Sequence, residues 1–247
     1  MQPEIAKILN VMKSFSKAIA AIMLTAVMCL VAGCKKDNGG NGTYKGHDYI
    51  DLGLPSGTMW ATCNVGAENP EDYGDYFAWG ETQPKIIYSE SNYKYSHGCC
   101  NQLTKYCSQS DFGHNGFTDK LTTLESSDDA AAVNWGEGWS TPTNKQWVEL
   151  LSRCDYTWTT QNGVNGFLFT ARNGNSIFLP AAGNRSDADL NHVGSGGYYW
   201  SRSLSKSLPD MAKGFSFSWN GGDWIDHDIY DYSREFGLTV RPVHSAK

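Results

Sequence analysis

Cys34 is the residue whose surroundings most clearly indicate a chemistry. The chain before it carries Lys13 and Lys17 and then no charged residue over positions 18–33. A basic start, a short apolar run and small residues before a cut are typical of a secretory signal peptide. The uncharged run is also short for a membrane-spanning helix, which needs about 20 residues. We therefore interpret residues 1–33 as a signal peptide, with Met12 as an alternative start.

Residues 31–34, Val-Ala-Gly-Cys, resemble the bacterial lipobox. The resemblance implies that the Cys34 thiol is diacylated and that the chain is cut before it. Each buried CH₂ contributes about 0.8 kcal/mol, and two or more acyl chains make the anchoring stable. An ordinary signal peptide with a chance cysteine is the alternative. Residues 34–43 are polar and glycine-rich, as a flexible tether is, and Lys35 favours outer-membrane sorting, at the cell surface or on the periplasmic face.

The cysteines after the anchor could form a disulfide or bind zinc. An exported domain permits disulfides, and an odd count leaves at least one thiol free. A small loop could close from Cys99 or Cys100 to Cys107. The alternative is a zinc site that also uses His97 and His114. We favour a disulfide or free thiols over zinc, because the spacing fits no standard finger and adjacent cysteines rarely bind one tetrahedral ion. The cysteines in question are Cys63, Cys99, Cys100, Cys107 and Cys154.

Oxygen ligands for calcium occur at alternating positions in one loop. Asp187, Asp189 and Asn191 have this spacing, although the sixth position is His192 and no later Glu completes the pattern. Asp223, in Trp-Asn-Gly-Gly-Asp, is a further candidate. Asp and Asn favour turns in any case, so we expect no cofactor and keep calcium as the alternative.

Two stretches of the carboxyl-terminal half are rich in glycine, aspartate and aromatic residues: "NRSDADLNHVGS" and "WNGGDWIDHDIYDYSREF". Exposed Trp and Tyr beside Asp and Asn can stack on a sugar or anchor a protein interface. The alternative is that both tryptophans of the second stretch are core residues. The ligand-binding candidates are Arg185, Asp187, Asp189, Asn191, Trp219, Asn220, Asp223 and Trp224.

Other function classes find little support in the sequence. Loss of residues 1–33 removes three lysines and one glutamate, so the formal charge falls from −6 to −8. An acidic chain without basic clusters argues against a nucleic-acid partner. G-x-S-x-G, H-E-x-x-H and phosphate-loop motifs are absent. We therefore expect a protein that is not an enzyme.

The elements that must position these residues are strands around two helices. Short strand-like runs come first, followed by an inserted polar loop region over residues 84–120. A short helix is predicted near 128–134, capped by Ser126, Ser127 or Asp128. A second begins at Thr143, which has capping-box spacing to Gln146. Asn173-Gly174 then predicts a hairpin. This order indicates an α+β domain over residues 44–247.

Motifs along nearly the whole domain resemble one family. They are "GLPSGTMWATCNVGAENPEDYGDYFAWGET", "AAAVNWGEGWSTPTNKQWVELL", "NSIFLPAAGNR", "GGYYWSRS" and "FGLTVRPV". In this order they resemble the Fibrobacter succinogenes major paralogous domain family, which is similar to C-type-lectin-like domains. The resemblance implies twisted antiparallel strands, paired first and last strands, and loops that carry ligand contacts. One departure is Ser140, where the family usually has an arginine.

The resemblance transfers no catalytic residue. It implies instead that its motif residues hold the fold: Trp60, Trp135, Trp139, Trp147, Trp200, Arg185 and Arg241. We expect a lipid-anchored outer-membrane protein, an adhesion or binding module whose partner is a glycan or a protein surface. A structural envelope protein without a small ligand is one alternative. Another is a hypervariable receptor whose residues 185–236 are diversified by a retroelement.

Overall fold

The structure is a computed structural model that describes residues 40–219, 221 and 225–245. The expected signal peptide and the anchor Cys34 lie outside the described residues, as do Asn220, Asp223 and Trp224. Gly39–Lys247 form one compact unit, and both hydrophobic clusters of the described residues are built within it. This unit therefore contains the core that it needs to fold by itself. None of the helices in the described part is long and apolar enough to cross a membrane.

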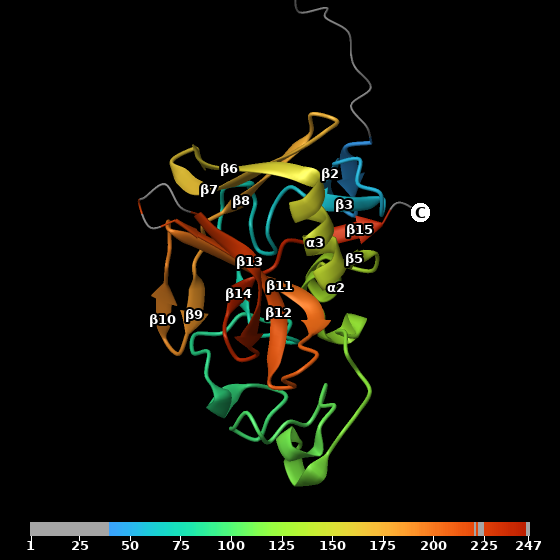
Figure 1. Cartoon of the computed structure of the whole chain (residues 1–247), viewed down its shortest axis with the longest axis vertical. Helices are drawn as coiled ribbons and strands as arrows, with labels where there is room; N and C mark the ends of the chain where they lie inside the picture. Colours follow the sequence, from blue (N-terminus) through green and yellow to red (C-terminus); the bar gives the residue numbers. More distant parts are fainter. Residues whose placement is uncertain (1–39, 220, 222–224, 246–247) are drawn as a thin grey trace, which may run out of the picture. The chain divides into compact units, whose positions relative to one another are not determined.

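The first sheet joins the two ends of this unit. Its strand order is β1-β2-β3-β15-β5, and β3 pairs antiparallel with β15, so that Trp60 lies opposite Val243. The amino-terminal hairpin and the last strand are therefore neighbours (Figure 1). The strands are β1 (Gly42–Tyr44), β2 (His47–Asp51), β3 (Thr58–Ala61), β5 (Trp139–Ser140) and β15 (Val243–Ser245).

The second sheet has the order β13-β12-β11-β14-β4, so β13 is an edge strand. Its three long strands pair antiparallel along most of their length, and the short hairpin β9–β10 lies beside the sheet (Figure 1). The strands are β4 (Tyr76–Phe77), β9 (Asn184–Ser186), β10 (Asp189–Asn191), β11 (Gly196–Leu204), β12 (Met211–Trp219), β13 (Ile225–Ser233) and β14 (Leu238–Thr239).

A third sheet of three antiparallel strands, β6-β7-β8, follows helix α3 directly. Asn173 and Gly174 form the turn between β7 and β8, where Gly174 has a φ of +86°. A positive φ is accessible to glycine at little cost, and the predicted hairpin is confirmed. The strands are β6 (Cys154–Gln161), β7 (Val164–Ala171) and β8 (Ser176–Pro180).

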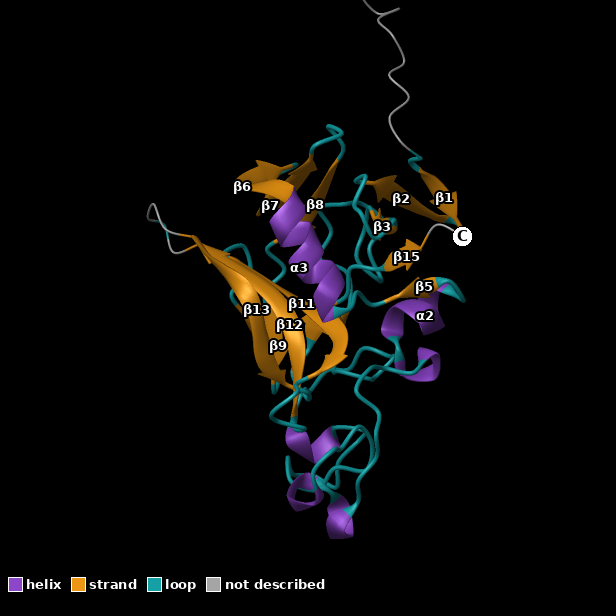
Figure 2. Cartoon of the chain, turned by 45° about the vertical axis from the view of Figure 1, so that its right-hand side comes forward, coloured by secondary structure: helices purple, strands orange, loops and turns teal. Residues whose placement is uncertain are grey.

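Helix α3 (Asn144–Arg153) begins at the predicted capping box. The Thr143 side chain accepts from the Gln146 N–H, and the Gln146 side chain accepts from the Thr143 N–H. Trp147 and Leu150 are fully buried where the helix packs between the second and third sheets (Figure 2). Glu149 of this helix accepts from the Ser56 N–H and hydroxyl and so links α3 to the loop between β2 and β3.

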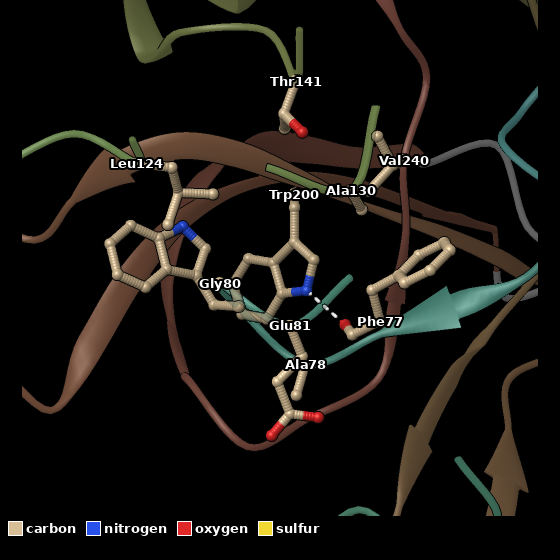
Figure 3. Close-up of a pocket in the computed structure, with 10 residues that line it drawn as sticks. Phe77, Ala78, Gly80, Glu81, Leu124, Ala130, Thr141, Trp200 and Val240 are labelled. Atoms are coloured by element: carbon tan, nitrogen blue, oxygen red, sulfur yellow. Dashed lines mark hydrogen bonds between the residues drawn. The ribbon is translucent and has the colours of Figure 1, made fainter. Parts of the chain in front are cut away.

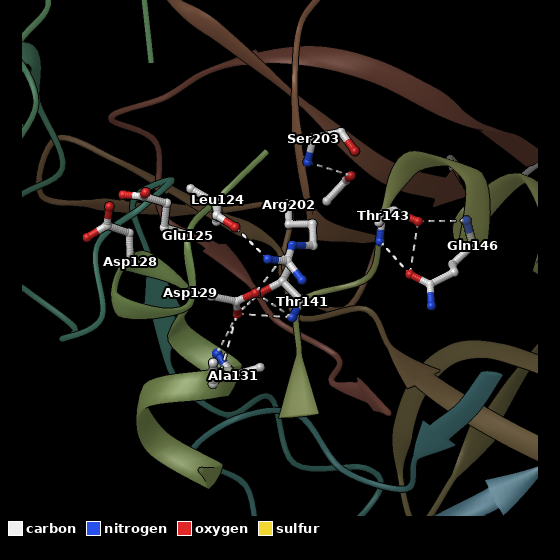
Figure 4. A network of polar contacts seen from close by, with 12 residues as sticks. Leu124, Glu125, Asp128, Asp129, Ala131, Thr141, Thr143, Gln146, Arg202 and Ser203 are labelled. Atoms are coloured by element: carbon white, nitrogen blue, oxygen red, sulfur yellow. Dashed lines mark hydrogen bonds and ion pairs between the residues drawn. The ribbon is translucent and has the colours of Figure 1, made fainter. Parts of the chain in front are cut away.

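Helix α2 (Ala130–Trp135) is the first predicted helix, but its cap differs from the expectation. Ser126–Asp128 form the 3-10 turn η4, and Asp129 is the N-cap. The fully buried Asp129 carboxylate accepts from the N–H groups of Ala131 and Ala132 and from the N–H and hydroxyl of Thr141 (Figure 4). It therefore ties α2 to the segment that leads into α3.

The Asp129 carboxylate also lies near a cation of the second sheet. Nε of Arg202, on β11, is 3.8 Å from Oδ2 of Asp129. Arg202 also donates to the carbonyl of Leu124 (Figure 4). Arg202 thus lies close to the Asp129 carboxylate. The family that this chain resembles usually has an arginine at position 140, where this chain has a serine.

The aromatic motif residues are buried, as residues that hold the fold should be. Trp60, Trp135, Trp139, Trp147 and Trp200 lie in the two hydrophobic clusters. Arg241 is also fully buried, and no carboxylate among the described residues forms an ion pair with it. Its guanidinium donates to Oδ1 of Asn64 and to the carbonyls of Ala61, Thr62 and Phe178. These bonds satisfy its donors, as burial of a charged group requires.

Residues 84–120 form a loop region with three 3-10 turns among its described elements: η1 (Glu90–Asn92), η2 (Ser110–Phe112) and η3 (His114–Gly116). The sequence predicted a polar loop region, but Tyr88, Tyr93 and Tyr106 are buried in the hydrophobic cluster that also contains Trp79 and Trp200. The fully buried Arg234 holds the loop region in place by donating to the Tyr93 hydroxyl and to the carbonyls of Lys105 and Tyr106. The described part as a whole is mostly antiparallel sheet with two α-helices, which is consistent with an α+β or a mostly-β fold.

Candidate functional site: an aromatic and acidic face of the second sheet

The two faces of the β11–β12–β13 ribbon differ in chemistry because successive side chains of a strand point to opposite sides. Phe215, Phe217 and Ile229 point to the side where α3 and the third sheet pack. On the other side, the register places Ser216 beside Tyr198 of β11 and Asp228 of β13. That second side carries alternate residues of β13: Asp226, Asp228, Tyr230 and Tyr232.

Three tyrosine rings form a row on this side. The rings of Tyr198 and Tyr232 have centroids 5.9 Å apart, and those of Tyr232 and Tyr230 are 6.5 Å apart, both edge to face. Tyr198 and Tyr232 are half-buried, whereas Tyr230 is 39% exposed. His192, just after β10, adds an exposed ring 5.7 Å from Tyr198. We call the set the tyrosine face: His192, Tyr198, Asp226, Asp228, Tyr230 and Tyr232.

Polar atoms on the tyrosine face are held by neighbours on the same side. The Tyr232 hydroxyl donates to Oγ of Ser216 over 2.7 Å, and the Tyr230 hydroxyl donates to Oδ1 of Asp226 over 3.1 Å. Desolvation raises the pKa of Tyr230, and the hydrogen bond to Asp226 raises it further. Burial and the charge of Asp226 likewise raise the pKa of Tyr198. At neutral pH the face thus presents neutral phenols beside carboxylates.

Gly214 makes room for the ring of Tyr232. A Cβ atom at this position would lie 2.9 Å from Cδ2 of Tyr232 and 3.1 Å from the carbonyl oxygen of Tyr199. A Cβ contact under 3.0 Å is essentially never found, and one of 3.1 Å is tighter than most real contacts. The absence of a Cβ at Gly214 therefore leaves the space that the Tyr232 ring, in the middle of the tyrosine row, needs.

The candidates predicted from the sequence do not all gather on one surface. Arg185 lies over the ring of Tyr76 at 5.2 Å, and its backbone pairs with Gly237. Asp187, with a φ of +51°, forms the exposed tip of the β9–β10 hairpin. Trp219 points to the opposite side of the sheet from the tyrosine face, where its ring lies 5.5 Å from that of Trp158.

Among the described residues, the calcium candidates do not converge on one point. Asp189 and Asn191 lie on β10, paired with Ser186 and Asn184 of β9. Within the described ranges, one group of three or more His, Cys, Asp or Glu side chains converges as metal ligands would, and it contains neither Asp187 nor Asp189. Asp223 falls outside those ranges.

The bridge expected between Cys99 or Cys100 and Cys107 is not formed. All five cysteines of the described residues are free thiols. Cys107 is buried, and its thiol donates to the carbonyl of Gln109. The zinc set weighed from the sequence is not assembled either, because the rings of His97 and His114 pack on each other with centroids 4.0 Å apart. The thiols of Cys99 and Cys100 lie near Glu90 instead.

The cavities described lie away from the tyrosine face. One, between Trp79 and Trp200, has a volume of about 10 Å³ (Figure 3), the least that holds a single water. Its lining is mostly apolar, with Glu81 and Thr141 as the polar side chains, and the indole N–H of Trp200 is used in a bond to the carbonyl of Phe77. An open groove of about 230 Å³ lies between Ile50, Pro70 and Phe178. The tyrosine face is instead suited to contact a surface.

The tyrosines of this face were not among the sequence candidates, although a signal for them exists. In "IDHDIYDYS" the residues Asp226, Asp228, Tyr230 and Tyr232 alternate, which is the period of one side of a strand. The sequence prediction rested instead on Trp219 and Trp224.

Comparison of the chain with protein-family models, with curated proteins and with solved structures found no match. The family resemblance therefore stays a prediction.

Proposed function

We propose that this chain is an exported, lipid-anchored binding or adhesion protein that recognises a glycan or a protein surface without doing chemistry. The observation that carries the proposal is the tyrosine face, a row of phenol rings bordered by Asp226 and Asp228 on an edge strand. Tyrosine combines apolar contact area with a polar tip. Carboxylates beside it can accept hydrogen bonds from sugar hydroxyls or from a partner's backbone.

We further propose that the fold is C-type-lectin-like. Support comes from the pairing of β3 with β15, which joins the first and last parts of the domain. The arrangement of α2 and α3 with twisted antiparallel strands agrees with it. The tyrosine face also lies within residues 185–236, the span that would vary if the chain were the hypervariable receptor of the alternative.

A glycan array probed with Gly39–Lys247, with calcium and again with a chelator, tests the proposal. We expect saturable binding that Tyr230→Ala weakens at least tenfold. Tyr156→Ala is the matched control, because Tyr156 is 37% exposed on β6. Binding that is equally lost in both variants would contradict a role for the tyrosine face. Silence of the array, together with failure to retain a protein partner, would favour a structural envelope protein.

A further inference from the structure

A cluster of possible metal ligands lies in the loop region of residues 84–120. It consists of Glu90, Cys99 and Cys100 and shares no residue with the tyrosine face. One ligand atom of each, a carboxylate oxygen and the two Sγ atoms, lies within 4.8 Å of the others. All three side chains are half-buried. Glu90 begins the 3-10 turn η1, and the carbonyl of Cys99 accepts from the Gln102 N–H in a tight turn. Two separate turns of the loop region thus bring thiols and a carboxylate to one point.

Further negative charge surrounds this cluster. Burial raises the pKa of Glu235, and the charges of Glu90 and Asp210 raise it further. Like charges raise a carboxyl pKa in this way only when they lie close to it.

Within the described part of the chain, the ion pairs leave out Glu90, Asp210 and Glu235. The charge of Arg234 lowers the pKa of Glu235, but its guanidinium donates to Tyr93 and to backbone carbonyls. Oδ1 of Asp210 is buried without a hydrogen-bond partner. Glu90 therefore adds to the two thiols a carboxylate that none of these ion pairs uses.

We propose that Glu90, Cys99 and Cys100 bind a thiophilic divalent cation of the zinc type. Adjacent cysteines rarely bind one tetrahedral ion, but here the fold adds the Glu90 carboxylate to the two thiols. Zinc takes thiolate and carboxylate ligands in a tetrahedral arrangement, with Zn–S of about 2.3 Å, which places two sulfurs roughly 3.8 Å apart. The separations here, at most 4.8 Å, need only a small contraction. Three protein ligands leave a fourth position for water. A bound ion would fix the loop region and keep adjacent thiols of an exported protein from oxidation.

Cobalt titration of Gly39–Lys247, reduced and stripped of metal, tests this site. Thiolate-bound Co²⁺ gives a charge-transfer band in the near ultraviolet, which carboxylates alone do not. We expect one equivalent of Co²⁺ to produce the band and one equivalent of Zn²⁺ to remove it. Cys99→Ser and Cys100→Ser should each weaken Co²⁺ binding at least tenfold and diminish the band. Glu90→Gln should weaken binding to a similar extent while the band persists at saturation.

Cys63→Ser is the matched control, because Cys63 is also half-buried and its thiol donates to the carbonyl of Glu68. It should leave the titration unchanged. A second readout is thermal unfolding, which Zn²⁺ should shift upward in the parent and in Cys63→Ser but not in Cys99→Ser. The proposal is overturned if the reduced chain gives no band, or if the band survives unchanged in both Cys99→Ser and Cys100→Ser. A Cys99–Cys100 disulfide that withstands reduction would overturn it as well.

Discussion

The hydroxyl of Tyr230 donates a hydrogen bond of 3.1 Å to Oδ1 of Asp226, four residues earlier on the same side of β13. The bond spans Asp228, whose side chain is exposed between them. A phenol held in this way loses less conformational freedom when a ligand binds, so a contact there gains affinity through preorganisation. The edge strand therefore presents an ordered acceptor and an ordered ring side by side.

Gly214→Ala should destabilise the domain by about 1–3 kcal/mol, the range found for overpacking a well-packed site. The added methyl would meet the Tyr232 ring and the Tyr199 carbonyl oxygen at 3.1 Å or less. Urea unfolding followed by tryptophan fluorescence measures the change. Tyr232→Ala in the same chain should make Gly214→Ala less costly, whereas additive effects would show that the ring is not the obstacle. Gly40→Ala, with its nearest atom at 3.5 Å, is the neutral control.

Asp128 should make stability depend on pH in the acid range. Burial opposes its ionisation, but hydrogen bonds from Lys105 and Tyr106 outweigh this and lower the pKa to about 2. The depressed pKa contributes stability that is present above the ordinary value near 4 and is lost as pH falls toward 2. Asp128→Asn should cost roughly 2 kcal/mol at neutral pH and flatten the loss of stability from pH 4 to pH 2. An unchanged acid limb would contradict this role.

Asp129→Ala should be far more costly than Thr143→Ala, although both remove a helix N-cap. The Asp129 carboxylate is fully buried and satisfies N–H groups of α2 as well as the N–H and hydroxyl of Thr141. Its loss leaves several buried donors unpaired, at a cost of roughly 3 kcal/mol or more. Thr143 is partly exposed, and an ordinary cap contributes about 1 kcal/mol. Equal effects in urea unfolding would argue against Asp129 as the link between α2 and α3.

Arg234→Lys should loosen the loop region although it keeps the charge. The planar guanidinium reaches the Tyr93 hydroxyl and three carbonyls, a geometry that an ammonium group cannot reproduce. We expect a loss of at least about 3 kcal/mol, as for other broken networks around a buried charge. Limited proteolysis should then cut within residues 84–120 before it cuts elsewhere. Arg153→Lys, exposed at the end of α3, should leave the pattern unchanged.

Local signals in the sequence sufficed for some elements and not for others. The capping box of Thr143 and Gln146 and the Asn173-Gly174 turn are set by neighbours in the chain, so both could be predicted. The cap of α2 could not, because Thr141, twelve residues away, helps to fix Asp129 as the N-cap. The tyrosine face also depends on distant pairing, since the register of β11 with β12 and of β12 with β13 brings Tyr198 beside Tyr232.

The most direct test of the binding proposal is the affinity of Gly39–Lys247 and its Tyr230→Ala variant for a ligand found on the glycan array or captured as a protein partner. Removal of a central aromatic contact should weaken binding at least tenfold, or about 1.4 kcal/mol. Tyr156→Ala, on the opposite side of β13 where the Tyr156 hydroxyl bonds to Nε2 of His227, should bind as the parent does, and urea unfolding should show that both variants are folded. Unchanged affinity of the Tyr230→Ala variant would contradict the account and place the binding surface elsewhere.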